Sequence, residues 1–582
     1  MTHFRSVFQS LLFVFLLCSC GNSREILPGK SGDVTFTNPI ITADFSDPDV
    51  IRVGKNYYMT ASSFYVSPGL PVLHSKDLVN WTILGHGIKQ NPNARLTYRG
   101  RNKDELDYNI PRFGMGVYAP SLRYHDGFFW IFWGDPDAGI YMVKTEDPAA
   151  DWSEPVLVHE ASGIIDPSPL WDETTGKAWL SFAYASSRSG KNSMIDVCEM
   201  SWDGTKLFGD PVTVFDARDS DRFPADRFHR TIEGTKFMQR DGWYYILCPA
   251  GGVERGWQTA MRAKDPFGPY EIRTICETGS TKINGPHQGG LVESYSGEWW
   301  FIHFQSTGTL GRIVRLEPAY WENEWPVIGI DTDNDGIGNP VSSYYYPHPP
   351  EPKQIQTSDD FNSGELGLQW QWVANPKDNW YELKDGNLLL PAIYSANDPL
   401  FETPHVLTQM FPGFSFTATV KVDLSSTEKV RGGLASFGRK TFDIGVEQLD
   451  KAFRISVRFN NDILVSAFTQ KSNNIWLRLT TTGEMPKPLE RRESNSIEDE
   501  VIRRENLQPY EYEDLERWRN GLIMGQFSYS FDGINFTDLS EPFEVRSGRW
   551  TGARIGLYSL KTGSEGNGHV AFDYIRIENS FK

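Results

Sequence analysis

The sequence predicts an all-β chain in which an N-terminal five-bladed β-propeller is followed by a C-terminal β-sandwich of the jelly-roll or concanavalin-like kind. Three observations lead to this prediction. A glycine followed by aromatic, strand-forming residues recurs five times before residue 345; a stretch rich in proline and tyrosine then breaks the pattern; and short alternating strands fill the remainder. A chain of 582 residues is also too long for one compact core, so at least two domains are expected.

The five glycine-aromatic copies define the blades. Each copy indicates a hairpin turn that leads into a buried strand. Successive glycines are about 50 to 70 residues apart, close to the length of one four-stranded blade. No helical periodicity of useful length competes with this pattern. The copies are Gly54-Lys-Asn-Tyr-Tyr-Met, Gly127-Phe-Phe-Trp-Ile-Phe, Gly176-Lys-Ala-Trp-Leu-Ser, Gly242-Trp-Tyr-Tyr-Ile-Leu and Gly297-Glu-Trp-Trp-Phe-Ile.

The domain boundaries follow from changes in pattern. The linker is predicted from Tyr344-Tyr-Tyr-Pro-His-Pro-Pro-Glu-Pro352, whose composition favours an extended, semi-rigid chain. A charged insertion at roughly 486–519 interrupts the sandwich pattern and is compatible with a surface helix that has a solvated face. We expect a lipoprotein signal peptide at 1–19, a tether at 20–34, the propeller at 35–345, the linker at 346–358 and the sandwich at 359–582.

The N-terminus predicts export and lipidation. Its apolar core, Leu11 to Leu17, is too short to span a bilayer and is typical of a secretory signal. The following Leu17-Cys18-Ser19-Cys20-Gly21 resembles a bacterial lipobox with Cys20 as the lipidated residue. A plain signal peptide without lipidation is the alternative. The predicted location is therefore the bacterial cell envelope, with the periplasmic side favoured over the outer surface because no acidic run follows Cys20.

Charge and cysteine content exclude several classes of partner. The net charge is −18 and no block rich in lysine or arginine occurs, so binding to nucleic acid or to an anionic membrane surface is disfavoured. Contact with a membrane is expected through the lipid anchor alone. Cys198, Cys248 and Cys276 are odd in number and lie in apolar strand patterns, which predicts buried thiols rather than disulfides or a metal site. The oligomeric state is left open.

One polar residue stands near the start of the first strand of four predicted blades. These residues are Asp47, Asp166, Glu233 and His287, and the second blade offers Tyr118-Ala119-Pro120 instead. Because the first strand of every blade lines the central channel, we expect them to converge on one axis. Two carboxyl groups with opposite protonation states are what glycosidic hydrolysis with inversion requires, about 6.5 to 9.5 Å apart. A third carboxylate nearby helps to keep the acid protonated.

Three acidic segments resemble the motifs of glycoside hydrolase family 43. They are Thr42-Ala-Asp-Phe-Ser-Asp47-Pro-Asp-Val-Ile, Gly163-Ile-Ile-Asp166-Pro-Ser and Ile232-Glu233-Gly-Thr-Lys-Phe; Gly116-Val-Tyr-Ala-Pro-Ser resembles the second-blade motif. Leu310-Gly-Arg312 and Trp321-Glu-Asn-Glu-Trp325-Pro are similar to the end of the propeller in two-domain β-xylosidases and α-L-arabinofuranosidases of that family.

The resemblance implies a role for each site residue. Asp47 is expected to be the general base and Glu233 the general acid, with Asp166 tuning and orienting that acid. It implies that Arg312, with Arg315 as its rival, binds the terminal sugar and that Phe64 forms an apolar wall. His287 is expected on the axis beside a water or a calcium ion, and Tyr118 stands where tryptophan is usual. No cofactor is required; a structural calcium ion is the possible addition.

The resemblance also implies the reaction. We expect an exo-acting, inverting enzyme that releases terminal α-L-arabinofuranose from hemicellulose side chains of xyloglucan or arabinoxylan. The alternatives are a β-D-xylosidase or bifunctional enzyme on xylo-oligosaccharides, and, from another class, a catalytically inactive glycan-binding lipoprotein. A retaining five-bladed enzyme is disfavoured because the Trp-Met-Asn-Asp-Pro-Asn-Gly segment typical of fructan-cleaving ones is missing.

A further acidic segment resembles a calcium loop only in its first half. Asp331-Thr-Asp333-Asn-Asp335-Gly336 begins like such a loop, but its twelfth position is Ser342 where a full loop has glutamate. A polar turn is therefore the prediction for this segment.

Overall fold

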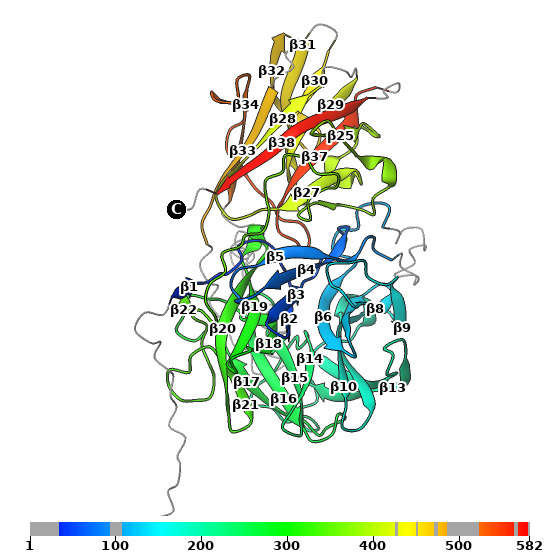
Figure 1. The fold of residues 1–582 in the computed structure, drawn as a ribbon, viewed down its shortest axis with the longest axis vertical. Coiled ribbons are helices and arrows are strands. Elements are labelled where there is room, and N and C mark those ends of the chain that lie inside the picture. Colours follow the sequence, from blue (N-terminus) through cyan, green and yellow to red (C-terminus); the bar gives the residue numbers. More distant parts are fainter. Residues whose placement is uncertain are drawn as a thin grey trace, which may run out of the picture.

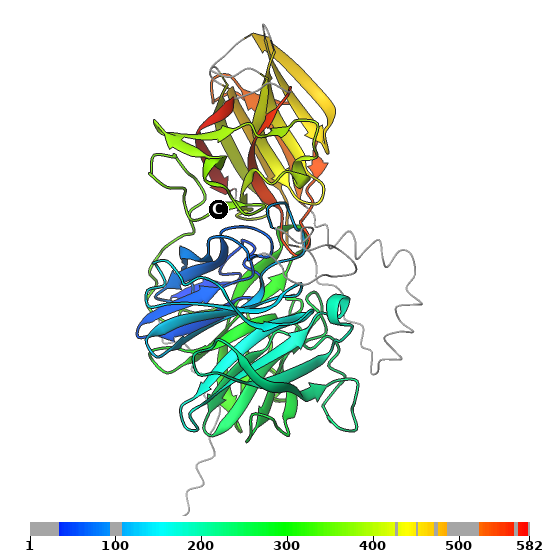
Figure 2. The same ribbon diagram turned by 90° about the vertical axis from the view of Figure 1, so that its right-hand side faces the viewer.

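The computed structural model describes residues 34–92, 108–424, 429–449, 452–470, 475–485, 523–563 and 568–579. Within these ranges the chain forms two β domains, with the sandwich stacked on the propeller (Figure 1). Figure 2 shows the same stacking after a turn of 90°. Helix is limited, in the described part, to α1 (Ser186–Ser189) and the 3-10 turns η2 (Gly308–Leu310), η3 (Asp378–Trp380) and η4 (Leu400–Glu402). The all-β prediction is confirmed.

Five antiparallel four-stranded sheets form the propeller, each from consecutive strands. The first strands β2, β6, β10, β14 and β18 surround the axis: β18, β2, β6, β10 and β14 contact one another in this order, and β18 also contacts β15 and β16 of the fourth blade. The blades are β2 (Asp49–Val53), β3 (Asn56–Thr60), β4 (Gly69–Ser75), β5 (Thr82–Ile88); β6 (Tyr118–His125), β7 (Phe128–Asp135), β8 (Gly139–Thr145), β9 (Val156–Glu160); β10 (Ile164–Asp172), β11 (Lys177–Tyr184), β12 (Met194–Met200), β13 (Leu207–Asp216); β14 (Lys236–Arg240), β15 (Trp243–Ala250), β16 (Trp257–Ala263), β17 (Glu271–Cys276); and β18 (His287–Glu293), β19 (Trp299–Ser306), β20 (Arg312–Glu322), β21 (Trp325–Ile328).

The recurring glycine lies at the turn between the first and second strand of each blade. All five of these glycines have positive φ, between 60° and 97°. L-residues rarely adopt this conformation, whereas glycine does so at little steric cost. An added Cβ would meet nothing within 4 Å at any of them, so the backbone angle alone selects glycine. The predicted hairpin turns are confirmed at Gly54, Gly127, Gly176, Gly242 and Gly297.

The two ends of the propeller are joined outside the blades. Strand β1 (Thr35–Thr37) pairs with β22 (Ser343–Tyr345), and Ile41 forms a backbone bridge with Val314 in the fifth blade. The segment that leads to Asp47 is thus held against the last blade, which contains Arg312.

The sandwich contains two eight-stranded sheets that enclose the largest apolar core. One sheet has the order β23 (Gln371–Trp372), β27 (Val406–Met410), β37 (Arg554–Lys561), β29 (Val430–Phe437), β30 (Phe442–Gln448), β31 (Ala452–Phe459), β32 (Asp462–Gln470), with β26 (Tyr394–Ser395) beside β37. The other has β24 (Glu382–Lys384), β25 (Asn387–Pro391), β38 (His569–Asn579), β28 (Phe416–Asp423), β33 (Ile475–Thr482), β34 (Met524–Ser530), β35 (Thr537–Asp538), with β36 (Phe543–Glu544) beside β34.

The two domains share a buried interface. One apolar cluster includes Tyr65 and Tyr108 of the propeller together with Phe437 and Tyr558 of the sandwich. Ser67 also exchanges backbone hydrogen bonds with Trp372. These contacts fix the sandwich relative to the first two blades, which matters for the site described below.

Several predictions concern single residues or terminal segments. The three described cysteines are buried and unpaired, as predicted. The signal peptide, Cys20 and nearly all of the tether lie outside the described residues, as does the charged insertion. Among the described residues, no helix is long and apolar enough to cross a membrane.

Candidate active site

Each inner strand carries one of the predicted residues at or near its start. Tyr118 and His287 are the first residues of β6 and β18, and Asp166 is the third residue of β10. Asp47 and Glu233 lie in the loops just before β2 and β14. The propeller thus takes one candidate from each blade to its axis, as the repeat pattern predicted.

Strained backbone marks the two aspartates. Asp47 has φ 53° and Asp166 has φ 57°, and each precedes a proline. Positive φ outside glycine costs on the order of 1–3 kcal/mol and persists where the surrounding structure enforces it. Phe64, with φ 51°, is held by two backbone hydrogen bonds to Val117.

Asp47 is an ion-paired carboxylate. Nη1 of Arg312 lies 2.8 Å from its Oδ1 and 3.0 Å from its Oδ2. The Ser62 hydroxyl donates to Oδ2 at 2.6 Å and accepts in turn from the Ala119 N–H. The side chain is 5% exposed. These donors hold the carboxylate in one orientation and compensate its negative charge, an arrangement that suits a general base.

Arg312 lies among aromatic rings. Its guanidinium carbon is 4.8 Å from the ring centroid of Phe304 and 5.9 Å from that of Phe64. Phe64 in turn meets Tyr118 edge to face, with centroids 5.3 Å apart. Arg315, the rival, lies elsewhere: its Nη1 donates to Gln305 and its Nη2 to the Val341 carbonyl. Arg312, Phe64 and Tyr118 are therefore brought together, and Arg315 is not among them.

Asp166 is fixed by the segment that carries Glu233. The Gly234 N–H donates to its Oδ2 at 2.7 Å, and the Thr235 hydroxyl donates to its backbone carbonyl at 2.7 Å. Burial, followed by the nearby Asp47 charge, raises the pKa of Asp166. Because Gly234 is adjacent to Glu233, the position of Asp166 is coupled directly to that of Glu233.

Glu233 has a different environment from Asp47. Its side chain is 28% exposed, and no described residue hydrogen-bonds to its carboxyl group. Burial and then the charges of Asp166 and Asp47 raise the pKa of Glu233. A protonated, accessible carboxyl group suits a general acid. The two carboxyl groups therefore have contrasting surroundings: Asp47 is ion-paired with Arg312, whereas Glu233 accepts no hydrogen bond from a described residue and its pKa is raised.

His287 is a buried, neutral imidazole at the axis. Burial, with Arg312 and His303 nearby, lowers its pKa to about 3. Neither ring nitrogen has a hydrogen-bond partner among the described residues, and Nε2 lies 4.0 Å from Glu233 Oε1. Calcium takes six to eight oxygen ligands, and the described residues bring no group of three potential ligands together here. An ion at His287 would depend on water for most of its ligands, so the calcium role stays a prediction.

The acidic segment that begins at Asp331 forms a hydrogen-bonded turn. The carboxylates of Asp331, Asp333 and Asp335 lie within 4.8 Å of one another. Asp331 accepts the backbone N–H groups of Asn334 and Gly336, which closes the loop on itself. This agrees with the predicted polar turn.

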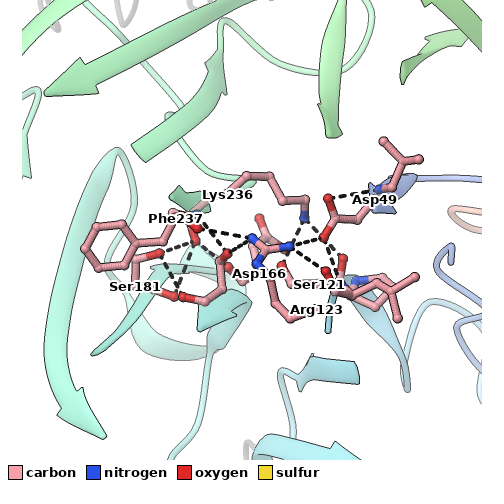
Figure 3. Close-up of polar contacts among 12 residues, drawn as sticks. Asp49, Ser121, Arg123, Asp166, Ser181, Lys236 and Phe237 are labelled. Atoms are coloured by element: carbon pink, nitrogen blue, oxygen red, sulfur yellow. Dashed lines mark hydrogen bonds and ion pairs between the residues drawn. The ribbon is translucent and has the colours of Figure 1, made fainter. Parts of the chain in front are cut away.

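A layer of buried charges lies next to the carboxylates (Figure 3). Arg123 donates to Asp49 Oδ2 at 2.7 Å and to Ser168 Oγ at 2.6 Å. The Lys236 ammonium donates to the Pro120 carbonyl at 3.1 Å and to Ser121 Oγ at 3.3 Å. These bonds join the first four blades, so Asp49 has a structural role. Arg123 lies outside the acidic motifs, and Lys236 lies within the Glu233 motif, where the sequence assigned it no role.

A loop of the sandwich reaches the site. Trp550 has its ring centroid 5.5 Å from the guanidinium carbon of Arg312, is 44% exposed and has φ 67°. The loop is anchored by the Gly552 N–H, which donates to Asp44 Oδ2 at 2.7 Å, and by the Ala553 N–H, which donates to the Thr309 carbonyl. The sequence predicts that a loop of the sandwich forms part of the pocket wall but does not identify which loop. The signal that could have found it is a tryptophan between glycines, Gly548-Arg-Trp-Thr-Gly552.

Comparisons with known proteins agree with this geometry. Residues 36–326 match glycosyl hydrolases family 43, and residues 358–494 and 517–578 match the β-xylosidase C-terminal concanavalin A-like domain. A candidate β-xylosidase of Xylanibacter ruminicola is 36% identical over 529 residues, 91% of this chain and 87% of that protein. The non-reducing end α-L-arabinofuranosidase BoGH43B of Bacteroides ovatus is 30% identical over 427 residues, 69% of this chain and 73% of that protein. The solved GH43 protein BlXynB of Bacillus licheniformis has the same fold, with a TM-score of 0.72 at 24% identity, over 94% of this chain and 100% of that chain.

Proposed function

Because the chain belongs to glycosyl hydrolase family 43, we propose that it is an exo-acting, inverting enzyme that removes a terminal pentose from hemicellulose. Family membership makes it a glycosidase that acts on a plant polysaccharide or oligosaccharide. The observation that carries the proposal is the contrast between Asp47, ion-paired with Arg312, and Glu233, whose pKa is raised within the same site.

The proposed reaction is a single displacement at the anomeric carbon. Asp47 removes a proton from a water molecule as the oxygen of that water forms the new bond to the anomeric carbon. Glu233 delivers its proton to the glycosidic oxygen as the bond between that oxygen and the anomeric carbon breaks. Asp166 orients the Glu233 segment through Gly234 and favours the protonated acid by its charge. The product sugar is then released with the opposite anomeric configuration.

The exo mode is supported by the loop from the second domain. Trp550 stands beside Arg312, and the loop is fastened to the propeller by backbone hydrogen bonds. A wall at this position favours a chain end over the middle of a polymer. Arg312 and the Phe64 ring would bind the polar and apolar sides of the terminal sugar.

For the sugar, β-D-xylose is the first candidate. The relative with 36% identity, matched over nine-tenths of this chain, is a candidate β-xylosidase. The α-L-arabinofuranose predicted from the sequence is the second candidate, supported by the 30% identity to an α-L-arabinofuranosidase. Xylan, arabinoxylan and xyloglucan side chains remain the proposed sources.

Initial rates on aryl β-D-xyloside and aryl α-L-arabinofuranoside test the proposal. We expect turnover of at least one, and proton NMR of the first product should show inversion. Retention at the anomeric carbon would contradict the assigned base. No turnover by folded protein would favour the glycan-binding alternative.

The lipid anchor is part of the proposal and has its own test. We propose that Cys20 carries the lipid and holds the enzyme in the bacterial envelope, facing the periplasm. Labelled palmitate should enter the wild-type chain and not Cys20→Ala in a bacterial host. Labelling of Cys20→Ala would contradict the assignment, and protease accessibility of intact cells would reveal an outward-facing protein.

A further inference from the structure

Lys236 is a buried cation next to the carboxylates of the site. It is 3% exposed and is the first residue of β14, shortly after Glu233 in the chain. Its ammonium donates to the Pro120 carbonyl at 3.1 Å and to Ser121 Oγ at 3.3 Å, and it forms no ion pair with a described residue (Figure 3). Lysine is almost never fully buried without a paired charge, because taking an ammonium group out of water is unfavourable. The charge of Lys236 therefore has to be compensated by groups that it does not contact.

Four charged side chains from the first three blades act on the Lys236 ammonium. Burial lowers the pKa of Lys236, and the positive charge of Arg123 on β6 adds to this effect. The carboxylates of Asp49, Asp166 and Asp47 act in the opposite direction. The other charged residues of the cavity that Lys236 lines are Arg52 and Glu293.

Asp166 is the carboxylate that has no cation in contact with it. The other two carboxylates each contact an arginine, at 2.7 Å in Asp49–Arg123 and at 2.8 Å in Asp47–Arg312. Asp166 accepts the Gly234 N–H, but its carboxylate is ion-paired with none of the residues that the structure describes. Burial and then the Asp47 charge raise the pKa of Asp166, whereas the Lys236 charge lowers it. Lys236 and Asp166 are thus the buried cation and the buried anion of this layer that lack a direct partner.

A chain of hydrogen bonds leads from Lys236 to Asp47. Pro120, which accepts from the ammonium, follows Ala119 in β6. The Ala119 N–H donates to Ser62 Oγ at 2.7 Å, and the Ser62 hydroxyl donates to Asp47 Oδ2 at 2.6 Å. Ala119 has φ 27°, and the pairing of β6 with β7 changes register at this point. Because such irregular backbone persists only where its surroundings enforce it, the bonds from Lys236 to the next two residues help to fix the segment.

We propose that Lys236 is a positioning residue, which fixes the β6 segment that orients Asp47 and supplies the cation that Asp166 lacks. The side chain acts through these two carboxylates and not on the sugar. It also links them to the acid, because Glu233 lies in the loop that leads directly to Lys236. The inference rests on the proposed function, since it gives Lys236 a part in that reaction.

The pH dependence of kcat/KM in Lys236→Met and Lys236→Arg tests the proposal, on the aryl glycoside that the wild-type chain turns over. Lys236→Met removes the charge, so carboxylates that must be ionised lose a stabilising cation, and the acidic limb of the profile should move to higher pH by about one pH unit. At the optimum, kcat should fall about 10- to 100-fold, with a smaller change in KM. Lys236→Arg keeps the charge and should restore the position of the limb. Lys177→Met is the matched control, because Lys177 is also the first residue of its strand but is exposed, and it should match wild type.

Urea unfolding between about pH 4 and about pH 8 gives a second measurement, which needs no turnover. Without the Lys236 cation, the pKa of Asp166 in the folded state should rise further. The free energy of unfolding should therefore fall more steeply with rising pH in Lys236→Met than in wild type. This excess should disappear when Asp166→Asn is combined with Lys236→Met. Lys236→Gln, which is also uncharged but keeps a polar side chain, replaces Lys236→Met if that variant does not fold, and the same results are expected.

An unmoved acidic limb together with a wild-type pH dependence of unfolding overturns the proposal. Equal losses of kcat/KM in Lys236→Met and Lys236→Arg, with the limb unmoved in both, also overturn it, because they show a packing role alone. If the wild-type chain turns over no aryl glycoside, the proposed function fails, and the unfolding measurement still decides whether Lys236 compensates Asp166. Failure of the proposed function and failure of this inference therefore give different results.

Discussion

Replacing Asp44 tests how the two domains build one site. Its carboxylate accepts the Arg312 N–H at Oδ1 and the Gly552 N–H at Oδ2, both at 2.7 Å, and the Ser46 hydroxyl at 3.0 Å. Asp44 thus ties the sugar-binding arginine of the propeller to the loop that carries Trp550. In Asp44→Ala both backbone donors lose their acceptor while they remain in a packed interface.

The magnitude follows from those two donors. Each buried, unsatisfied N–H costs about 1–3 kcal/mol, which gives about 2–6 kcal/mol for the pair. Burial raises the pKa of Asp44, so removing this carboxylate also relieves an unfavourable desolvation. We therefore expect a net loss of about 2–4 kcal/mol in the free energy of unfolding. Displacement of Arg312 by even about 1 Å should lower kcat/KM by about 10- to 100-fold.

Urea unfolding followed by tryptophan fluorescence measures the stability term, and aryl-glycoside kinetics measure the activity term. Asp44→Asn keeps the shape but replaces one acceptor oxygen by an NH₂ group, so it should lie between wild type and Asp44→Ala. Asp210→Asn, an exposed carboxylate on β13, is the matched control and should match wild type. Asp44→Ala with wild-type stability and kcat/KM would refute the idea that this carboxylate joins the domains at the site.

Four further predictions concern the site itself. Glu233→Gln should lower kcat by about 10²–10⁴-fold on substrates with poor leaving groups, because these need a proton from the acid. It should lower kcat much less on activated aryl glycosides, which do not need that proton. Equal losses of kcat on both kinds of substrate would show that Glu233 is not the general acid. Asp166→Asn removes a charge that raises the pKa of Glu233, so the alkaline limb of the pH–kcat/KM profile should move to lower pH, and an unmoved limb would leave Asp166 a purely structural role. Burial raises the pKa of Asp166 in the folded state. The wild-type free energy of unfolding should therefore fall as pH rises from about 4 through that raised pKa. Urea unfolding at several pH values should show a smaller fall in the free energy of unfolding for Asp166→Asn over the same window. Trp550→Ala should raise KM several-fold with little change in melting temperature, because the side chain is 44% exposed; an unchanged KM on oligosaccharides would place the ring outside the substrate path.

The sequence alone determined the architecture and which polar residues the repeat brings to the propeller axis. Glycines at the five turns act locally, since the positive φ that each turn needs is a property of a few consecutive residues. The repeat then implies that the first strands share an axis, so Asp47, Asp166 and Glu233 could be grouped from their places in the repeat. Arg312 was chosen over Arg315 by resemblance, and the hydrogen bonds of the two side chains agree with that choice.

The tertiary structure decided which distant segments complete the site. The Asp44–Gly552 hydrogen bond joins residues 508 positions apart, and Trp550 reaches Arg312 only because the sandwich is seated on the first two blades. Periodicity and turn signals describe neighbours in the chain, whereas the docking of two domains depends on the shape and burial of whole surfaces. That is why the carboxylates were predictable from sequence, while the domain contact that surrounds them was not.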